Sequence, residues 1–260
     1  MIESNPMLSL GYELDRWNIF GIKEDILIDI SAKSNSHILL SGMSGSGKSY
    51  AEFGLIGKLI LAEKELNGEY YFADYKGDDM FECLQGTPRY RSFKQTTELL
   101  DIVYNRLKLR MSGEDKTRHP ITLIWDEYMA NILALISEDK SNANKVMSKV
   151  SEILLMGRSK GIRFICSCQR PDMVAFPVGS RLNYGVVIIL GTGKSIFEML
   201  MPDHLDKIKN REFKRGEGAV LLQGAELHYI KIGKINDFEN VKNICIEALS
   251  KPIVDGEAKR

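Results

Sequence analysis

The segment 42–49 constrains this chain most, because its residues follow the pattern of a loop that binds phosphate. The pattern is a glycine, four further residues and then glycine, Lys48 and Ser49. A short apolar run at 37–40 precedes the segment, and apolar residues recur at helical spacing over 50–65. A strand, a glycine-rich loop and a helix N-terminus direct unpaired N–H groups and the positive end of a helix dipole at one point. The sequence therefore predicts an anion site here.

The same segment predicts ATP and Mg²⁺ as ligands. Lys48 is expected to reach the β- and γ-phosphates, and the Ser49 hydroxyl is expected to bind the metal ion. The residues predicted to bind ATP are Gly42, Met43, Ser44, Gly45, Ser46, Gly47, Lys48, Ser49 and Tyr50.

Two adjacent carboxylates follow the apolar run 121–125. Asp126 is expected to complete the Mg²⁺ site from the tip of a strand. Glu127 is expected to orient or deprotonate the water that attacks the γ-phosphate, a group that a nucleotide kinase does not need. Gln169 follows the apolar run 162–168 and is placed to sense the γ-phosphate from a neighbouring strand tip. The chain lacks the Leu-Ser-Gly-Gly-Gln signature of ABC ATPases and the Asn-Lys-x-Asp signature of GTPases.

The order of predicted elements indicates an α/β fold. Apolar strands alternate with amphipathic helices, a pattern typical of a mostly parallel sheet with helices on both faces. Two runs near the end, 218–222 and 227–232, predict an antiparallel hairpin. The other predicted strands are 26–30 at a sheet edge, 37–41, 69–74, 121–125, 162–168 and 184–190, and the predicted helices are 50–65, 96–111 and 142–159.

The chain is expected to divide into three parts. Residues 1–34 form a lead-in that carries the edge strand, 35–250 form the ATPase domain, and 251–260 form a polar tail. Four cysteines match no zinc spacing and suit a reducing compartment. No signal peptide and no apolar run of about 20 residues is present, so we expect a cytoplasmic protein without direct membrane insertion.

Five motifs, taken in their order along the chain, carry a resemblance to a known family. The chain resembles the motor domain of the FtsK/SpoIIIE translocases, within the FtsK–HerA superfamily, over about residues 9–235. Tyr75 stands where that family has proline. The motifs are Asp74-Tyr75-Lys76, Asp126-Glu127-Tyr128, the segment from Gly157 to Pro171, Arg181-Leu182 and the segment from Gly216 to Leu221.

The resemblance implies a RecA-like P-loop fold and an ATPase that acts as a ring, a hexamer, on double-stranded DNA. It implies that Gln169 is a sensor and that Arg158 is an arginine finger acting on the nucleotide of the next subunit. The spacing of Arg158 alone favours a solvated helix end. The resemblance does not extend to the membrane-spanning region or to the winged-helix domain of the family, so it implies a bare motor.

The charge balance gives no global argument for DNA, because 35 Lys and Arg residues offset 35 Asp and Glu residues. DNA would have to meet local basic loops, and each candidate could also be an ordinary surface charge. The candidates are Lys116, Arg118, Lys160, Arg163 and Arg181.

Two alternative functions remain open. One is a genome-packaging or conjugation-coupling ATPase of a virus or mobile element, which would need a portal or a relaxase as partner. The other is a nucleotide-gated adaptor that recruits a DNA-processing partner, such as a replication protein, without translocating DNA.

Overall fold

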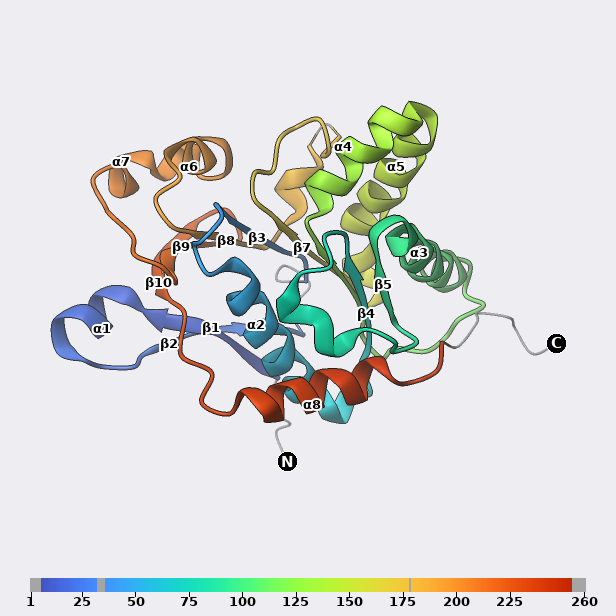
Figure 1. The fold of residues 1–260 in the computed structure, drawn as a ribbon, viewed down its shortest axis with the longest axis horizontal. Coiled ribbons are helices and arrows are strands. Elements are labelled where there is room, and N and C mark those ends of the chain that lie inside the picture. The colour runs from blue at the N-terminus through green and yellow to red at the C-terminus, as the bar shows by residue number, and fades with distance from the viewer. Residues whose placement is uncertain (1–5, 32–35, 178, 254–260) are drawn as a thin grey trace.

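The computed structural model describes residues 6–31, 36–177 and 179–253 (Figure 1). Within those residues, ten strands form one sheet in the order β2-β1-β10-β9-β8-β3-β7-β6-β4-β5. The strands are β1 Met7–Glu13, β2 Asp25–Asp29, β3 Ile38–Gly42, β4 Glu69–Asp74, β5 Tyr90–Ser92, β6 Ile121–Asp126, β7 Ile162–Cys168, β8 Val186–Leu190, β9 Glu217–Leu222 and β10 Glu226–Lys231. The strands from β8 to β5 in that order are parallel, and β2, β1, β10 and β9 pair antiparallel.

Helices cover both faces of the sheet. The α-helices are α1 Leu14–Phe20, α2 Lys48–Ala62, α3 Thr96–Ser112, α4 Tyr128–Glu138, α5 Lys140–Met156, α6 Lys194–Leu200, α7 Leu205–Ile208 and α8 Phe238–Leu249. The short 3₁₀ helices include η3 Asp79–Leu84, η5 Gly157–Lys160 and η6 Ser180–Asn183. One apolar layer packs α3, α4, α5 and α6 on the sheet, and the other packs α2 and α8. The predicted α/β fold with a mostly parallel sheet and a closing hairpin is confirmed.

The central strands form because they are apolar along their whole length. Every residue of β3, β4, β6, β7 and β8 is buried, as expected for parallel strands covered on both faces. Alternation then divides each strand between the layers. In β7, Phe164, Cys166 and Cys168 belong to the layer of α3 to α6, and Ile165 belongs to the layer of α2.

The lead-in is more structured than the sequence indicated. The predicted edge strand is present as β2, at the end of the sheet. A second strand, β1, was not predicted, although its Leu8 and Leu10 are buried at alternate positions. It joins the lead-in to β10 in the same sheet. The helix α8, also not predicted, packs against α2. Of the predicted tail, residues 254–260 lie outside the described residues.

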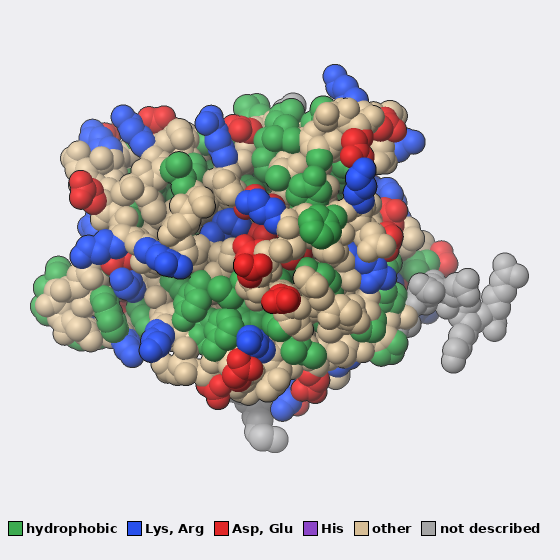
Figure 2. Space-filling view, viewed as in Figure 1, with side chains coloured by type: hydrophobic (Ala, Val, Ile, Leu, Met, Phe, Trp, Pro, Cys, Tyr) green, Lys and Arg blue, Asp and Glu red, His purple; other side chains and the backbone are tan. Residues whose placement is uncertain are grey.

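Charged side chains of both signs lie on the face shown in Figure 2, with Lys and Arg denser on the side of α1 and β10. None of the helices in the described ranges has the length and apolar character needed to cross a bilayer.

A charged cluster at the amino end of β4 makes the stability of the fold depend on pH. Burial by itself would raise the pKa of Glu69, but the hydrogen bond with His119 and the charge of Arg106 outweigh burial and lower this pKa from 4.5 to about 2. Because the pKa in the folded state is the lower one, Glu69 stabilises the fold fully above pH 4.5. This contribution is lost as the pH falls from 4.5 to 2.

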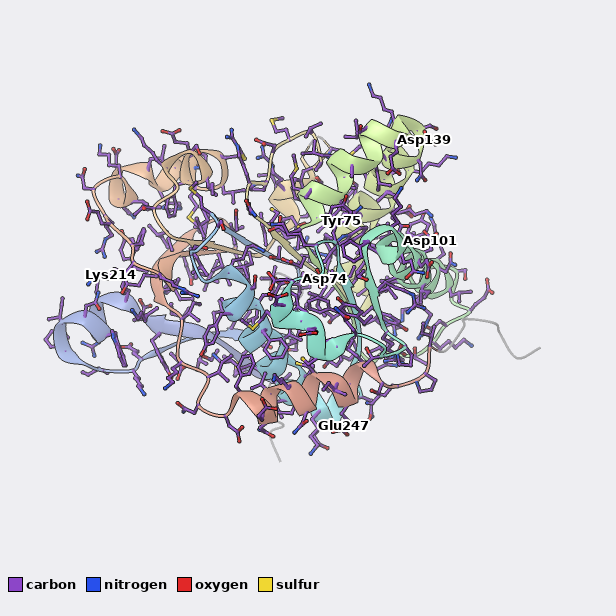
Figure 3. The ribbon with its side chains drawn as sticks, in the orientation of Figure 1. Asp74, Tyr75, Asp101, Asp139, Lys214 and Glu247 are labelled. Atoms are coloured by element: carbon purple, nitrogen blue, oxygen red, sulfur yellow. The ribbon has the colours of Figure 1, made fainter. Side chains whose placement is uncertain are left out.

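We therefore expect Glu69 to account for a loss of free energy of unfolding on the order of 3 kcal/mol across that pH range. The measurement is urea unfolding of the native chain and of Glu69→Gln at several pH values. The difference between the two slopes of unfolding free energy against pH gives the contribution of Glu69. Glu247, exposed on α8, provides the matched control, because Glu247→Gln should keep the native slope (Figure 3). Equal slopes for the native chain and Glu69→Gln would contradict the prediction.

Candidate active site

The phosphate loop joins β3 to α2 and leaves no room for larger residues at its start. A Cβ on Gly42 would lie 2.6 Å from the Ser46 Oγ and 2.9 Å from the Leu190 carbonyl oxygen. Gly47 has φ +92° and is the N-cap of α2, a conformation that glycine adopts without strain. No described side chain caps this helix end, so its N–H groups stay available to an anion.

Lys48 lies at the centre of a buried polar network. Its Nζ lies 2.7 Å from the Asp126 Oδ1, 2.9 Å from the Ser167 Oγ and 3.3 Å from the Glu127 Oε1. Burial by itself lowers the pKa of Lys48, but the nearby carboxylates, Asp126 first, outweigh it and raise the pKa. Lys48 is therefore positively charged at neutral pH, as a group that binds phosphate must be.

A third carboxyl group, Glu52, lies beside this network one turn along α2. It is fully buried, and neither of its carboxyl oxygens has a hydrogen-bond donor among the described residues. Burial, followed by the negative charge of Asp126, raises the pKa of Glu52 well above its usual range. Protonation would remove the repulsion between the two groups and give Glu52 a hydrogen to donate.

The residues predicted to bind Mg²⁺ fit that ion chemically. The Oδ1 of Asp126 accepts hydrogen bonds from Lys48 and Ser167, whereas its buried Oδ2 has no partner among the described residues. The Ser49 hydroxyl donates to the Asp78 Oδ2 at 3.0 Å. Hydroxyl and carboxylate oxygens are the ligands that Mg²⁺ prefers. Ser49 and Asp126 could hold the ion, and Asp78 could hold one of its waters.

Glu127 lies where a catalytic carboxylate is expected. Its Oε1 lies 3.3 Å from the Lys48 Nζ, 3.4 Å from the Lys76 Nζ and 3.3 Å from the Gln169 Nε2. Its backbone has φ +53°, a left-handed conformation that costs a non-glycine residue energy and is found at functional sites. This turn directs the chain from β6 straight into α4, with Glu127 at the junction.

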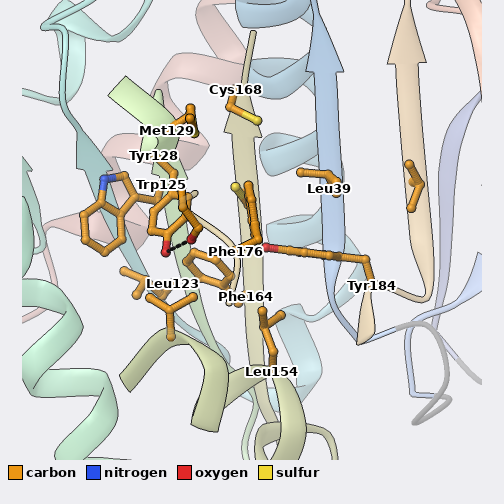
Figure 4. Packing of buried hydrophobic residues seen from close by; sticks show 14 of the residues in the cluster. Leu39, Leu123, Trp125, Tyr128, Met129, Leu154, Phe164, Cys168, Phe176 and Tyr184 are labelled. Atoms are coloured by element: carbon orange, nitrogen blue, oxygen red, sulfur yellow. Dashed lines mark hydrogen bonds between the residues drawn. The ribbon is translucent and has the colours of Figure 1, made fainter. Parts of the chain in front are cut away.

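An aromatic cluster packs at the junction between β6 and α4 (Figure 4). The Trp125 and Tyr128 rings meet edge to face with centroids 5.2 Å apart, and Tyr128 contacts Phe164 in the same way at 5.9 Å. The Tyr128 hydroxyl donates to the Ala175 carbonyl oxygen at 3.0 Å. Because Trp125 and Tyr128 flank the two carboxylates, this packing holds Asp126 and Glu127 at the strand tip.

The tip of β4 lies beside the carboxylate pair, at the centre of the view in Figure 3. Asp74 accepts hydrogen bonds from the Gly77 and Asp78 N–H groups and from the Tyr90 hydroxyl. The N–H of Tyr75 donates to the Asp126 carbonyl oxygen at 3.3 Å. The FtsK/SpoIIIE family has proline at this position, and proline lacks that N–H. Tyrosine therefore adds a link between the two strand tips.

Arg158 lies at the amino ends of the central strands, whereas the phosphate loop lies at their carboxyl ends. It belongs to η5, which precedes β7, whereas the phosphate loop follows the parallel neighbour β3. A cavity of about 210 Å³ at the amino ends of β6 and β7 is lined by Arg158, Arg118 and Glu63 among others. The structure therefore brings Lys48, Ser49, Asp126, Glu127 and Gln169 together and leaves Arg158 apart from them.

One of the basic residues predicted to contact DNA is a buried structural residue. Arg163 is 5% exposed, and its guanidinium group lies 2.7 Å from the Glu63 Oε1 and donates to the Thr122 Oγ1 and the Ile30 carbonyl oxygen. This corrects the prediction for Arg163, because a guanidinium group engaged in this way cannot reach phosphates outside. Lys116 and Arg118 are exposed before β6, and Lys160 and Arg181 are half-buried.

Four residues of the site were not among the predicted ones. They are Glu52, Lys76, Asp78 and Ser167, all of which contact predicted residues or lie beside them. A polar residue inside the apolar run of β7 was a visible signal for Ser167, and the Asp-Tyr-Lys motif was one for Lys76. The other two depend on how α2 and the turn after β4 pack, which no local sequence pattern indicates.

Known proteins resemble this chain in sequence and in fold. No protein-family model matches the chain. The FtsK domain-containing protein YdcQ of Bacillus subtilis (strain 168) is 22% identical over 171 residues, which are 60% of this chain and 34% of that protein. The chain thus spans about a third of the length of this curated relative.

Two solved structures have the same fold. The pCW3 conjugation coupling protein TcpA, in a monomer form with ATPγS, superposes with a TM-score of 0.68 and 21% identity over 94% of this chain and 71% of that one. The cytoplasmic domain of the type VII secretion ATPase EccC of Thermomonospora curvata gives a TM-score of 0.68 and 16% identity over 98% and 32% of the chains. The resemblance carried by the motifs is confirmed: the chain is similar in sequence to an FtsK-domain protein and has the RecA-like P-loop fold of these ATPases.

Proposed function

We propose that this chain hydrolyses ATP and uses the energy to move double-stranded DNA, as an FtsK-type motor that works in a ring. The observation that carries the proposal is the meeting of three strand tips. Lys48 after β3 pairs with Asp126 and Glu127 at the end of β6, and Gln169 after β7 donates a hydrogen bond to Glu127. A γ-phosphate, its metal ion and an attacking water all need groups of these kinds.

The mechanism assigns each side chain a task. Lys48, now paired with Asp126 and Glu127, binds the β- and γ-phosphates when ATP enters. Mg²⁺ held by Ser49 and Asp126 would neutralise the charge that develops on the phosphates. Glu127 then accepts the proton of the attacking water, and Gln169, whose amide already contacts Glu127, orients that water and senses the γ-phosphate.

The two similar structures belong to proteins with different tasks: TcpA is a conjugation coupling protein and EccC is a secretion ATPase. TcpA favours the alternative of a conjugation-coupling or genome-packaging ATPase with a relaxase or portal as partner. A third candidate, an adaptor that recruits a replication protein, would hydrolyse ATP independently of DNA. Displacement of a triplex strand from duplex DNA separates a translocase from such an adaptor.

DNA should stimulate hydrolysis through basic loops outside the site. Lys116 is exposed in the loop before β6, so Lys116→Glu should raise the duplex concentration for half-maximal stimulation about tenfold at low salt, with basal hydrolysis unchanged. Lys194 on α6 has an exposed side chain and provides the matched control Lys194→Glu, which should behave as the native chain does. An ATPase assay titrated with linear duplex measures both variants. Hydrolysis that no duplex stimulates at low salt would contradict DNA as the cargo.

A further inference from the structure

A cavity of about 440 Å³ opens beside the phosphate loop, a volume typical of small-molecule sites. Four segments of the chain build it. Gly47 and Tyr50 come from the loop and the first turn of α2, Arg215 and Gly216 precede β9, and the remaining wall comes from the lead-in and from the segment 231–236. The residues of the lead-in are Tyr12, Trp17 and Lys23.

We infer that this cavity receives the base and ribose of the nucleoside triphosphate, so that the lead-in is the part of the chain that recognises the nucleoside. The inference rests on the proposed function and deepens it. The N-terminus of α2 binds the phosphates, and Gly47 and Tyr50 lie on the border between that helix end and the cavity. A nucleoside attached to the phosphates there has this neighbouring hollow to enter.

The aromatic wall of the cavity suits a flat heterocycle. The Tyr12 and Trp17 rings stack with centroids 5.9 Å apart and an angle of 11° between their planes. Both rings are half-buried, and the Lys23 Nζ lies 5.6 Å from the centroid of Trp17. A Cβ on Gly233 would lie 2.9 Å from the Tyr12 ring, so glycine lets this ring lie against the backbone. The wall is therefore formed in advance of binding.

The charge of the cavity suits the rest of the nucleotide. Lys23, Arg215, Lys231 and Lys234 line it, and no Asp or Glu is among the described residues of its wall. Lys231 is paired with Glu217 at 2.7 Å, whereas Arg215 and Lys234 are exposed. Figure 2 shows Lys and Arg side chains gathered on this side of the molecule. Cations beside an aromatic wall match a base that is joined to phosphate.

A direct link ties the cavity to the helix of the phosphate loop. The Tyr50 hydroxyl accepts a hydrogen bond from the Ile235 N–H at 2.6 Å, and the Tyr50 ring stacks on Phe238 with centroids 6.5 Å apart. The segment after β10 is therefore fixed to the first turn of α2. A nucleoside in the cavity contacts this segment and the lead-in together, which inorganic triphosphate cannot do.

The test compares ATPγS with inorganic tripolyphosphate by calorimetric titration of the full chain in Mg²⁺. We expect the native chain to bind ATPγS at least tenfold more tightly than tripolyphosphate, since stacking of one base is worth about that factor. Trp17→Ala should lose about tenfold in affinity for ATPγS and none for tripolyphosphate. Phe20→Ala, an exposed aromatic on the same helix outside the cavity, should bind both ligands as the native chain does.

A second measurement uses fluorescence and a conservative variant. The chain has two tryptophans, and Trp125 is buried in the core. The change in tryptophan emission caused by ATPγS should disappear in Trp17→Phe, which should retain most of the native affinity. Equal affinity of the native chain for both ligands, or identical behaviour of Trp17→Ala and Phe20→Ala, would overturn this inference and leave the phosphate loop intact. Binding of neither ligand would overturn the proposed function and this inference together.

Discussion

Replacing Glu127 with glutamine should lower kcat for ATP hydrolysis by about 10²- to 10⁴-fold and leave the affinity for ATP nearly unchanged. Glutamine keeps the size of the side chain and its hydrogen bonding, but its amide cannot accept a proton from water. The three groups that now contact the Glu127 Oε1, from Lys48, Lys76 and Gln169, would still find an oxygen acceptor. The loss should therefore fall on the chemical step and not on binding.

Single-turnover hydrolysis and equilibrium binding of labelled ATP separate these two effects. The matched control is Glu138→Gln at the exposed far end of α4, which should hydrolyse ATP at the native rate. If Glu127→Gln turned over ATP as the native chain does, the water-activating role of this residue would be wrong, whatever the cargo.

The central part of the site could be predicted because topology alone brings it together. Lys48, Asp126 and Gln169 each follow an apolar run, and parallel neighbouring strands place their carboxyl ends at one edge of the sheet. Their spacing along the chain is irrelevant once the strands pair as β3, β7 and β6 do. The motifs thus carried the geometry without any knowledge of the packing.

Residues whose role depends on packing between distant segments could not be predicted in this way. Arg163 has the sequence context of a surface charge, yet Glu63, 100 residues earlier, pairs with it in the interior. Glu52 has the helical spacing of an ordinary polar position, and only the contact of α2 with the sheet buries it. The strand β1 is visible in its alternation, but its place next to β10 is a long-range pairing that no local pattern encodes.

Replacing Arg158 with alanine should lower kcat by roughly 10³-fold and leave nucleotide affinity unchanged, if this arginine completes the site of an adjoining subunit. Within one chain it cannot do so. The seven residues of β7 separate Arg158 from the carboxyl ends of the strands, where Gln169 and the phosphate loop lie. This span is roughly 20 Å. Arg118 lines the same cavity, and Arg118→Ala is the matched control that should keep the native basal rate when both variants are assayed without DNA.

Mixing two inactive variants makes the action in trans directly measurable. In a ring assembled from equal amounts of Arg158→Ala and Glu127→Gln subunits, a site works when its own subunit keeps Glu127 and the adjoining subunit keeps Arg158. Random assembly gives that combination at about one half of one half of the sites, so about a quarter of the native activity should return. Each variant alone should stay inactive. Full activity of Arg158→Ala by itself would eliminate the arginine finger. Loss of activity without any recovery on mixing would confine the role of Arg158 to its own subunit, and hydrolysis would then no longer require a neighbour.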